Sequence, residues 1–203
     1  MNAIVVGTKK IAPTKIICIG RNYVEHIAEL GNKIPDDMVV FLKPNSAIST
    51  KLISYQQEPI HYEAEICFLY ENGAFSAVGF GLDLTKRTLQ GSLKAKGLPW
   101  ERAKSFDGSA IFSHFVEIPD IPSSLALELS IDHKPVQRGR VAQMIYKPDQ
   151  ILLELATFIS LQDGDIVMTG TPMGVGIIQS DQIFTGTIRD QERVLVNGEW
   201  TAS

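Results

Sequence analysis

Basic runs and long apolar segments are missing from this sequence of 203 residues, and each absence excludes a class of protein. The net charge is −4 and the Lys and Arg residues are scattered, which makes the chain a poor candidate for a nucleic-acid partner. No apolar stretch approaches the roughly 18–20 residues that cross a bilayer, and the first residues lack the apolar core and cleavage site of a secretory signal. We therefore expect no nucleic-acid partner, no membrane and a cytoplasmic location.

Cysteine is scarce, and the two cysteines present, Cys18 and Cys67, both lie inside apolar runs. This setting predicts buried free thiols, as in a reducing cytoplasm, rather than a structural disulfide. Cys and His spacings typical of zinc sites are absent, as are a G-x-S-x-G nucleophile elbow and the G-K-[ST] of a P-loop. The sequence therefore gives no support to a zinc protein, to a serine hydrolase of that kind or to a P-loop protein.

Linkers, repeats and low-complexity tracts are also absent, so a single domain over residues 1–203 is expected. Many short apolar runs bounded by Gly, Pro, Asp or Asn are typical of short strands. Helical spacing of apolar residues occurs over 148–161, and two further helices are expected over 85–96 and near 22–31. The pattern predicts a β-rich α+β domain with two or three helices at its margins.

Two local signals add detail to this expectation. Asn22 followed by Glu25 matches a capping box, and Gly31 is suited to close the short helix. A helix of about two turns needs packing or a ligand to hold it, because isolated short helices are marginal in water. Near the C-terminus, Asn197-Gly198 directly after an apolar run predicts a hairpin turn.

The segment 61–69 carries Glu63 and Glu65, which the alternation of a strand places on one face. Beyond Glu65 both faces become apolar, so this strand runs into the core. Two carboxylates at such an entrance repel each other, and a hard divalent cation such as Mg²⁺, Mn²⁺ or Ca²⁺ resolves that conflict. Spacing alone favours the alternative, an edge strand with two solvated glutamates.

Asp83 lies between two leucines at the end of another predicted strand. An aspartate in that setting is either the cap of the following helix or a third ligand. Three carboxylates around one divalent ion leave about three octahedral positions open. Those positions suit a bidentate oxygen ligand and a water molecule.

His26 and Glu29 are three residues apart on the short predicted helix and therefore share a face. A carboxylate orients an imidazole and raises its basicity, as in a general base that activates water; the alternative is two solvated surface residues. Lys104, among small and aromatic residues, either binds a substrate anion or lies on the surface. The loop 169–176 is either an anion-binding nest or a tight turn.

Six motifs together resemble the fumarylacetoacetate hydrolase family, in its short single-domain branch. The branch includes acylpyruvate hydrolases, oxaloacetate decarboxylases and oxaloacetate keto–enol tautomerases. The resemblance covers residues 13–198, and six motifs in one order are far more specific than any one of them. In chain order they are GRNY (20–23), FLKP (41–44), HYEAE (61–65), LDLTKRTLQ (82–90), GLPWERAKSFD (97–107) and GDIVMTGTPMGVG (164–176).

The resemblance implies a mixed β-sandwich roll, assembled as a homodimer, with a short N-terminal lid helix in a segment of about 22–36. It implies Mg²⁺ or Mn²⁺ at the three carboxylates and a catalytic dyad on the lid. One departure is Thr88, which stands where the family has an acidic residue after the arginine matched by Arg87. A supporting salt bridge is therefore expected to be missing. The predicted site residues are His26, Glu29 and Lys104 as catalytic, Arg21, Gln90 and Thr171 as substrate-binding, and Glu63, Glu65 and Asp83 as metal ligands.

The predicted function is metal-dependent hydrolysis of a C–C bond in small 2,4-dioxo acids of the acylpyruvate or fumarylpyruvate type, through a metal-stabilised enolate. The intact dyad favours hydrolysis, because hydrolysis needs a base that produces a nucleophile. Two alternatives use the same site, an oxaloacetate keto–enol tautomerase and an oxaloacetate decarboxylase. A third alternative is a non-catalytic, metal-stabilised dimer that binds a dicarboxylate.

Overall fold

A computed structural model of the chain describes residues 1–29, 31 and 35–203. The predicted lid segment 22–36 therefore lies partly outside the described residues. Within the described part, the larger of two main sheets has the strand order β4-β3-β15-β9-β10-β11-β5, with β12 paired to β10. Its strands are β3 (Lys15–Gly20), β4 (Val39–Pro44), β5 (Ile48–Ser49), β9 (Ala64–Glu71), β10 (Ala74–Asp83), β11 (Ala110–Phe112), β12 (Val116–Glu117) and β15 (Ile166–Met168).

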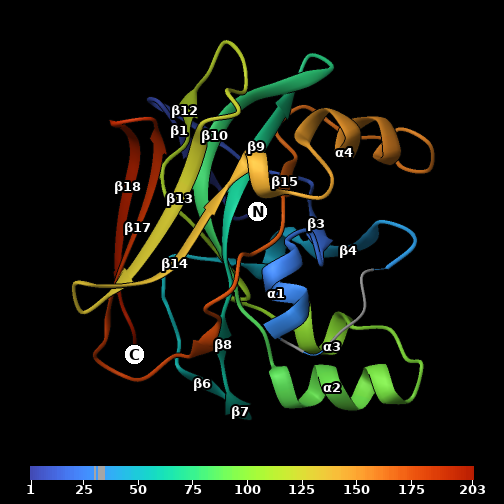
Figure 1. Ribbon diagram of the computed structural model, residues 1–203, viewed down its shortest axis with the longest axis vertical. Helices are drawn as coiled ribbons and strands as arrows, with labels where there is room; N and C mark the ends of the chain where they lie inside the picture. Colours follow the sequence, from blue (N-terminus) through green and yellow to red (C-terminus); the bar gives the residue numbers. More distant parts are fainter. Residues whose placement is uncertain (30, 32–34) are drawn as a thin grey trace.

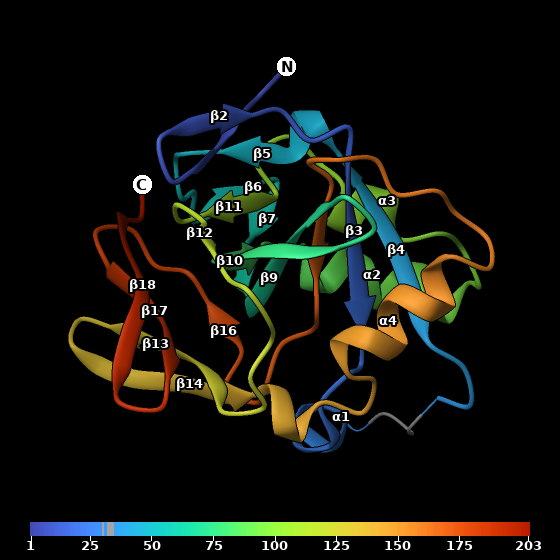
Figure 2. The ribbon, with the colours of Figure 1, turned by 90° about the horizontal axis from the view of Figure 1, so that it is seen from above.

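The larger sheet is mixed, because β15 runs parallel to β3 and β11 runs parallel to β5, whereas β9 and β10 form an antiparallel pair. The smaller sheet is antiparallel in the order β14-β13-β17-β18 and lies to the left of β9 and β10 in Figures 1 and 2. Its strands are β13 (Leu125–Ile131), β14 (Lys134–Arg140), β17 (Ile183–Asp190) and β18 (Arg193–Thr201). The short remaining strands are β1 (Ile4–Val6), β2 (Lys9–Ile11), β6 (Tyr55–Gln56), β7 (Glu58–Pro59), β8 (His61–Tyr62) and β16 (Gly176–Ile177).

The main core lies between the two sheets, where Phe68 and Phe80 of the larger sheet meet Phe184 of the smaller one. Alternation along β9 sends Ile66 and Phe68 into this core and Cys67 toward a second core on the opposite face. The result is the β-rich α+β sandwich that the sequence predicted. Figure 1 shows α1, α2 and α3 gathered at one end of the larger sheet, with α4 at the other end.

The three predicted helices are present but shorter than their predicted ranges. They are α1 (Val24–Glu29), α2 (Arg87–Ala95) and α4 (Pro148–Leu155). A further short helix, α3 (Glu101–Lys104), was not predicted, and single 3₁₀ turns lie at Asn45–Ala47 and Val141–Gln143. In the described part of the chain, none of the helices has the length and apolarity needed to span a membrane.

Two local predictions are wrong, each because tertiary contacts use the residue differently. Asn22 does not cap α1: its Oδ1 accepts the N–H of Tyr146 at 2.7 Å and its Nδ2 donates to the Thr169 carbonyl at 2.8 Å. Gly198 makes no turn, since it pairs with Gly186 inside the β17–β18 ladder. A Cβ at Gly198 would lie 2.5 Å from the Trp200 ring, so this glycine makes room for an aromatic side chain.

Gly31 does close α1 as predicted, with φ +61 and its N–H bonded to the Ala28 carbonyl at 3.0 Å. The predicted buried thiols are also confirmed, because Cys18 and Cys67 are both free and buried. Each pairs with Met168 of the intervening strand β15, so their Cα atoms are about two strand spacings apart, roughly 10 Å. That separation is too long for a disulfide.

Candidate active site

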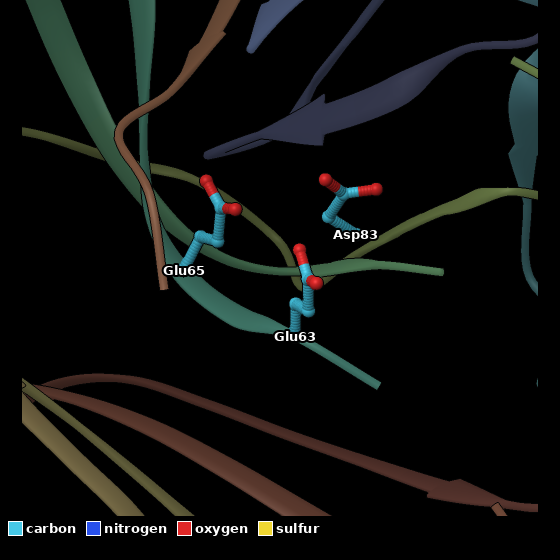
Figure 3. A group of neighbouring side chains, drawn as sticks. All are labelled: Glu63, Glu65 and Asp83. Carbon is cyan, nitrogen blue, oxygen red and sulfur yellow. The ribbon is translucent and has the colours of Figure 1, made fainter. Parts of the chain in front are cut away.

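Three buried carboxylates converge at one end of the larger sheet (Figure 3). Glu63 directly precedes β9, Glu65 lies on β9, and Asp83 is the last residue of β10. The antiparallel register sets Glu65 opposite Gly81, two residues before Asp83, which brings the third carboxylate beside the other two. One oxygen from each residue lies within 4.8 Å of the others. The predicted shared face of Glu63 and Glu65 is thereby confirmed.

Asp83 is not the cap of α2, which was the alternative that the sequence allowed. That helix begins with Lys86 at its N-cap position, without a side-chain cap hydrogen bond. The carboxylate of Glu58 instead accepts the N–H of Thr88 at 2.8 Å, which satisfies a donor of the first turn. Asp83 is therefore available to the carboxylate cluster.

Two buried lysines surround Asp83. Lys104 Nζ donates hydrogen bonds of 2.7 Å to Glu63 Oε2 and to Asp83 Oδ2, and a third of 2.7 Å to Thr85 Oγ1. Lys43 Nζ lies 2.8 Å from Asp83 Oδ1 and also donates to the Lys104 carbonyl. The surface alternative for Lys104 is therefore wrong, since only 2 % of this residue is exposed.

The opposite charges of Glu63 and Lys104 lower the pKa of the glutamate and raise the pKa of the lysine. Burial would raise the pKa of Glu63, but Lys104 and Arg87 outweigh it and hold that pKa well below its usual range. Burial lowers the pKa of Lys104, but Asp83 and Glu63 outweigh it and raise that pKa. Both groups are therefore charged at neutral pH.

Glu65 differs from its two neighbours in its partners. Burial, and then the charges of Asp83 and Glu63, raise its pKa well above the usual value. Its Oε2 accepts the Gly170 N–H at 2.6 Å, and no basic side chain in the described part of the chain forms an ion pair with it. Glu65 thus lacks a balancing cation, which a divalent ion would supply.

The donor set fits a hard divalent cation. Three carboxylate oxygens meet in a buried place, and the one partner of Asp83 Oδ1 among the described residues is the ammonium of Lys43. Oxygen-only donors favour Mg²⁺ or Mn²⁺ over zinc, which prefers nitrogen and sulfur. Glu63, Glu65 and Asp83 therefore form a group that can hold such an ion.

His26 and Glu29 lie next to each other on α1, as their spacing predicted. His26 Nδ1 is 3.1 Å from Glu29 Oε2, and His26 is almost fully buried and lines the pocket that contains the three carboxylates. Glu29 Oε1 accepts the Gly174 N–H at 2.9 Å, which ties α1 to the loop after β15. The solvated alternative for His26 is therefore wrong.

Two N–H groups of the loop 169–176 bind the protein's own glutamates, so the anion-binding nest stays a prediction. Gly170 donates to Glu65 and Gly174 donates to Glu29. Gly170 has φ +100, and a Cβ there would lie 2.8 Å from the Asn22 Cβ. Glycine is required at this position because a side chain would push the loop away from Glu65.

The predicted substrate-binding residues Arg21, Gln90 and Thr171 line the same pocket. Gln90 Oε1 accepts a hydrogen bond of 3.0 Å from Arg87, and Thr171 Oγ1 accepts one of 2.9 Å from Gln137. Eight of the nine predicted site residues therefore line one pocket, and the ninth, Glu29, lies beside His26.

Arg87 keeps partners in the site although Thr88 follows it. Its guanidinium pairs with Glu63 and donates to Gln90, whereas its Nε is buried and makes no hydrogen bond among the described residues. The expected loss of a supporting salt bridge at Thr88 stays a prediction.

Sequence reasoning missed several residues of the site. Lys43 is fully buried against Asp83, and Lys94, Phe41 and Trp100 line the pocket. The signal for Lys43 was a lysine inside the apolar strand VVFLKP, since a buried lysine requires an anionic partner. Nothing in the spacing of Lys94 or Trp100 marked them.

Comparisons with known proteins agree with this geometry. The family model described as fumarylacetoacetate (FAA) hydrolase C-terminal matches residues 15–201. The oxaloacetate tautomerase YcgM of Escherichia coli is 35% identical over 192 residues, which cover 86% of this chain and 88% of that protein. The mitochondrial oxaloacetate tautomerase of Homo sapiens is 36% identical over 190 residues, covering 84% of this chain and 86% of the relative.

Solved structures share the fold over nearly the whole chain. A candidate fumarylacetoacetate isomerase/hydrolase from Oleispira antarctica superposes with a TM-score of 0.94 at 30% identity, covering 100% of both chains. Fumarylpyruvate hydrolase from Pseudomonas aeruginosa, crystallised with Mn²⁺ and pyruvate, gives a TM-score of 0.88 at 27% identity and covers 99% of this chain and 95% of that one.

Proposed function

This chain belongs to the fumarylacetoacetate hydrolase family, and from that premise we propose that it is a divalent-metal-dependent enzyme that interconverts the keto and enol forms of oxaloacetate. One observation carries the proposal. The buried carboxylates of Glu63, Glu65 and Asp83 share a pocket with the His26–Glu29 pair. The pocket thus combines a site for a Lewis acid with a candidate proton carrier.

Glu63, Glu65 and Asp83 are the proposed ligands of Mg²⁺ or Mn²⁺. An ion held there would supply Lewis-acid polarisation of the carboxylate and 2-oxo oxygens of a 2-oxo acid. The Mn²⁺ and pyruvate in the fumarylpyruvate hydrolase structure support this assignment. Lys104, bonded to Glu63 and Asp83, keeps a positive charge at the same place and favours an anionic substrate.

His26 is the proposed carrier of the C3 proton. Glu29 lies 3.1 Å from Nδ1, so Nδ1 keeps its proton toward Glu29 and Nε2 is the nitrogen that exchanges a proton with the substrate. The N–H of Gly174 holds Glu29 in place from the other side. Removal of the proton from C3 and its return to the 2-oxo oxygen amount to keto–enol exchange.

A second reaction, hydrolysis of a 2,4-dioxo acid, has its own support. The same base can activate water, which then attacks the 4-oxo carbon so that the bond between C3 and C4 breaks. The structural neighbour named as a fumarylpyruvate hydrolase favours this reaction. The relatives named as oxaloacetate tautomerases cover most of the chain at higher identity, and they move our preference from hydrolysis to tautomerisation.

The test is a metal-replete screen of enol-oxaloacetate, acylpyruvates and fumarylpyruvate, with the His26→Ala variant and with His114→Ala as an exposed-histidine control. We expect enol–keto exchange that needs added Mg²⁺ or Mn²⁺ and falls by about 10²–10⁴-fold in His26→Ala, the usual range for loss of a general base. The control keeps full activity. C–C hydrolysis without tautomerisation would favour the second reaction, and loss of CO₂ alone would favour the decarboxylase.

A complete lack of turnover, together with metal-dependent binding of a dicarboxylate, would favour the non-catalytic alternative. We also propose that the chain assembles as a homodimer, by analogy with the family. Light scattering at micromolar concentration tests this proposal, and a monomer at every concentration would contradict it.

A further inference from the structure

The strand β14 of the smaller sheet packs against the loop 169–176, which carries Thr171 into the pocket. The contact is close enough to need a glycine on each side. A Cβ at Gly139 of β14 would lie 3.0 Å from the Pro172 ring, and a Cβ at Gly174 of the loop would lie 2.1 Å from the Val136 carbonyl oxygen. A side chain at either position would push the strand and the loop apart, so β14 helps to set the position of the loop.

Gln137 of β14 links this loop to the strand of the metal ligands. Its side chain is buried and lies outside the pocket lining. Its Oε1 accepts at 3.0 Å the N–H of Ala64, the residue between the two glutamates of the carboxylate cluster. Its Nε2 donates to the Pro172 carbonyl at 2.8 Å and to Thr171 Oγ1 at 2.9 Å. The oxygen and both N–H bonds of the amide are therefore in use.

The backbone groups around Gln137 fix the orientation of its amide. A backbone N–H can only donate, so the atom that faces Ala64 is the amide oxygen. A carbonyl oxygen can only accept, so the atom that faces Pro172 is the amide nitrogen. The same nitrogen must donate to Thr171, whose hydroxyl oxygen is thus the acceptor.

The Thr171 hydroxyl keeps its own hydrogen for a further partner, because its oxygen already accepts from Gln137. Among the described residues, its acceptor is the Pro172 carbonyl at 3.4 Å, which is long for an O–H donor and therefore a weak bond. That carbonyl also accepts the shorter bond from Gln137. Since Thr171 lines the pocket, its hydrogen is available to an acceptor oxygen of a bound ligand.

We propose that Gln137 is a positioning residue, which orients the Thr171 hydroxyl so that it donates to an anionic oxygen of the bound 2-oxo acid. The inference rests on the proposed function, because it requires a 2-oxo acid in the pocket. Gln137 acts from outside the pocket, through one hydrogen bond. A hydroxyl that is oriented before the substrate arrives stabilises the developing charge without having to reorient during the reaction.

Gln137→Glu reverses this hydrogen bond at nearly constant volume. A carboxylate still accepts the Ala64 N–H but has no hydrogen to donate, so the Thr171 hydroxyl turns toward it and away from the pocket. We expect kcat/KM to fall by at least about tenfold, within the range for a hydrogen bond to a charged group. The substrate is enol-oxaloacetate, or acetylpyruvate if the screen shows hydrolysis instead.

Calorimetry with Mn²⁺ alone separates this role from an effect on the metal ligands. Gln137→Glu keeps the bond to Ala64 and adds negative charge, so it should bind Mn²⁺ at least as tightly as wild type. Gln143→Glu is the matched control, because it makes the same change at an exposed residue of the 3₁₀ turn that follows β14. It should keep the wild-type kcat/KM.

A double-mutant cycle with Thr171→Val shows whether Gln137 acts through Thr171. Thr171→Val removes the hydroxyl and should itself lower kcat/KM by at least about tenfold. In that background Gln137→Glu should lower kcat/KM by less than about threefold, because the group that it reorients is gone. If Gln137→Glu does not fold, as judged by its melting temperature, Gln137→Met also removes the donor and takes its place in the cycle. Its loss should again be smaller in Thr171→Val than in wild type.

The outcomes separate this inference from the proposed function. Wild-type kcat/KM in Gln137→Glu, or losses that add in the cycle, would overturn the inference and leave the proposed function standing. Weaker Mn²⁺ binding in Gln137→Glu, in proportion to the loss of kcat/KM, would also overturn it, because Gln137 would then act on the metal ligands. If wild type turns over no 2-oxo acid in the presence of Mg²⁺ or Mn²⁺, the proposed function is wrong and the inference falls with it.

Discussion

In the described part of the chain, buried carboxylates lie in two places, and the two differ in how many hydrogen bonds and ion pairs the carboxylates accept. Asp165 precedes β15 and lies beside the start of β3, and its side chain is fully buried. Its Oδ1 accepts hydrogen bonds from the Thr14 hydroxyl at 2.7 Å and from the Thr14 and Lys15 N–H groups at 3.1 Å each. Its Oδ2 accepts the Gln162 N–H at 2.8 Å and an ion pair from Lys15.

The carboxylate cluster differs from Asp165, because one of its members, Glu65, accepts few hydrogen bonds and has no ion-pair partner among the described residues. Glu65 has the Gly170 N–H as its partner and two carboxylates as neighbours, so its charge is opposed rather than balanced. Burial would raise the pKa of Asp165, but the hydrogen bonds from Lys15 and Thr14 outweigh it and lower that pKa, whereas the pKa of Glu65 is raised. A saturated carboxylate stabilises the fold, and an unsaturated one is available to a ligand.

The sharpest test of this contrast is Glu65→Gln. Because the change removes a charge that Asp83 and Glu63 oppose, the melting temperature of the metal-free protein should stay equal or rise. Activity should fall by at least about 10³-fold, or about 4 kcal/mol, through loss of a metal ligand. Thermal melting and a turnover assay give the two values.

The rise in melting temperature that Mg²⁺ or Mn²⁺ gives wild type should also disappear in Glu65→Gln. Glu71→Gln, exposed at the far end of the same strand, is the control and should behave as wild type. A destabilised Glu65→Gln that still turns over substrate would reverse the roles that we assign to the two places.

Asp165→Asn should lower the stability of the fold and leave the activity intact, the reverse of what is expected for Glu65→Gln. The amide replaces one acceptor oxygen with a donor and leaves Lys15 without its ion pair, so we expect a loss of about 3 kcal/mol in the free energy of unfolding. Urea denaturation measures this loss. Activity per folded molecule should remain, because Asp165 is not in the pocket lining.

Asp163→Asn is the matched control for this variant. Asp163 is exposed and accepts the Asn72 N–H at 2.9 Å. Asp163→Asn should therefore lower the free energy of unfolding by less than about 1 kcal/mol. Equal losses in the two variants would show that the saturation of Asp165 adds nothing to stability.

Lowering the pH should reduce the difference in the free energy of unfolding between wild type and Asp165→Asn. The folded-state pKa of Asp165 lies below its usual value, so its stabilisation is fully present above about pH 4, the pKa of an unfolded aspartate. It is lost as pH falls through the lower folded-state pKa. Denaturation curves of both proteins between pH 7 and the acid limit of folding measure the difference, and a constant difference would contradict the assignment.

Thr14→Val is expected to have the smallest effect. The variant loses the hydroxyl bond to Asp165 and keeps the backbone N–H bond, so we expect about 1 kcal/mol of destabilisation. Thermal melting detects a change of that size in a chain of this length. An effect as large as that of Asp165→Asn would mean that one bond, rather than the whole set, holds this carboxylate.

Much of the site followed from local sequence. Alternation alone put Glu63 and Glu65 on one face, and a three-residue spacing put His26 beside Glu29, because both patterns depend only on the repeat of a strand or a helix. The short apolar runs gave the β-rich class, and the ordered motifs gave the family. These features are encoded within segments of about ten residues.

Other features depend on residues that are distant in the chain. Lys43 on β4 pairs with Asp83 at the end of β10, forty positions later, although β3, β15 and β9 lie between the two strands in the sheet. No local rule marks that partner. Asn22 bonds Tyr146 and Thr169 instead of capping its own helix, because those groups, which are distant in the chain, lie beside its buried side chain.

The sequence by itself therefore determined the β-rich class, the face shared by Glu63 and Glu65, and most of the kinds of residue that meet at the site. Tertiary structure alone decided which charges are balanced, so that Asp165 is saturated and Glu65 is not. It also decided that Lys94 and Arg21 share the pocket. The reason is physical: periodicity is a property of one segment, whereas the electrostatic balance of a buried group depends on every segment packed around it.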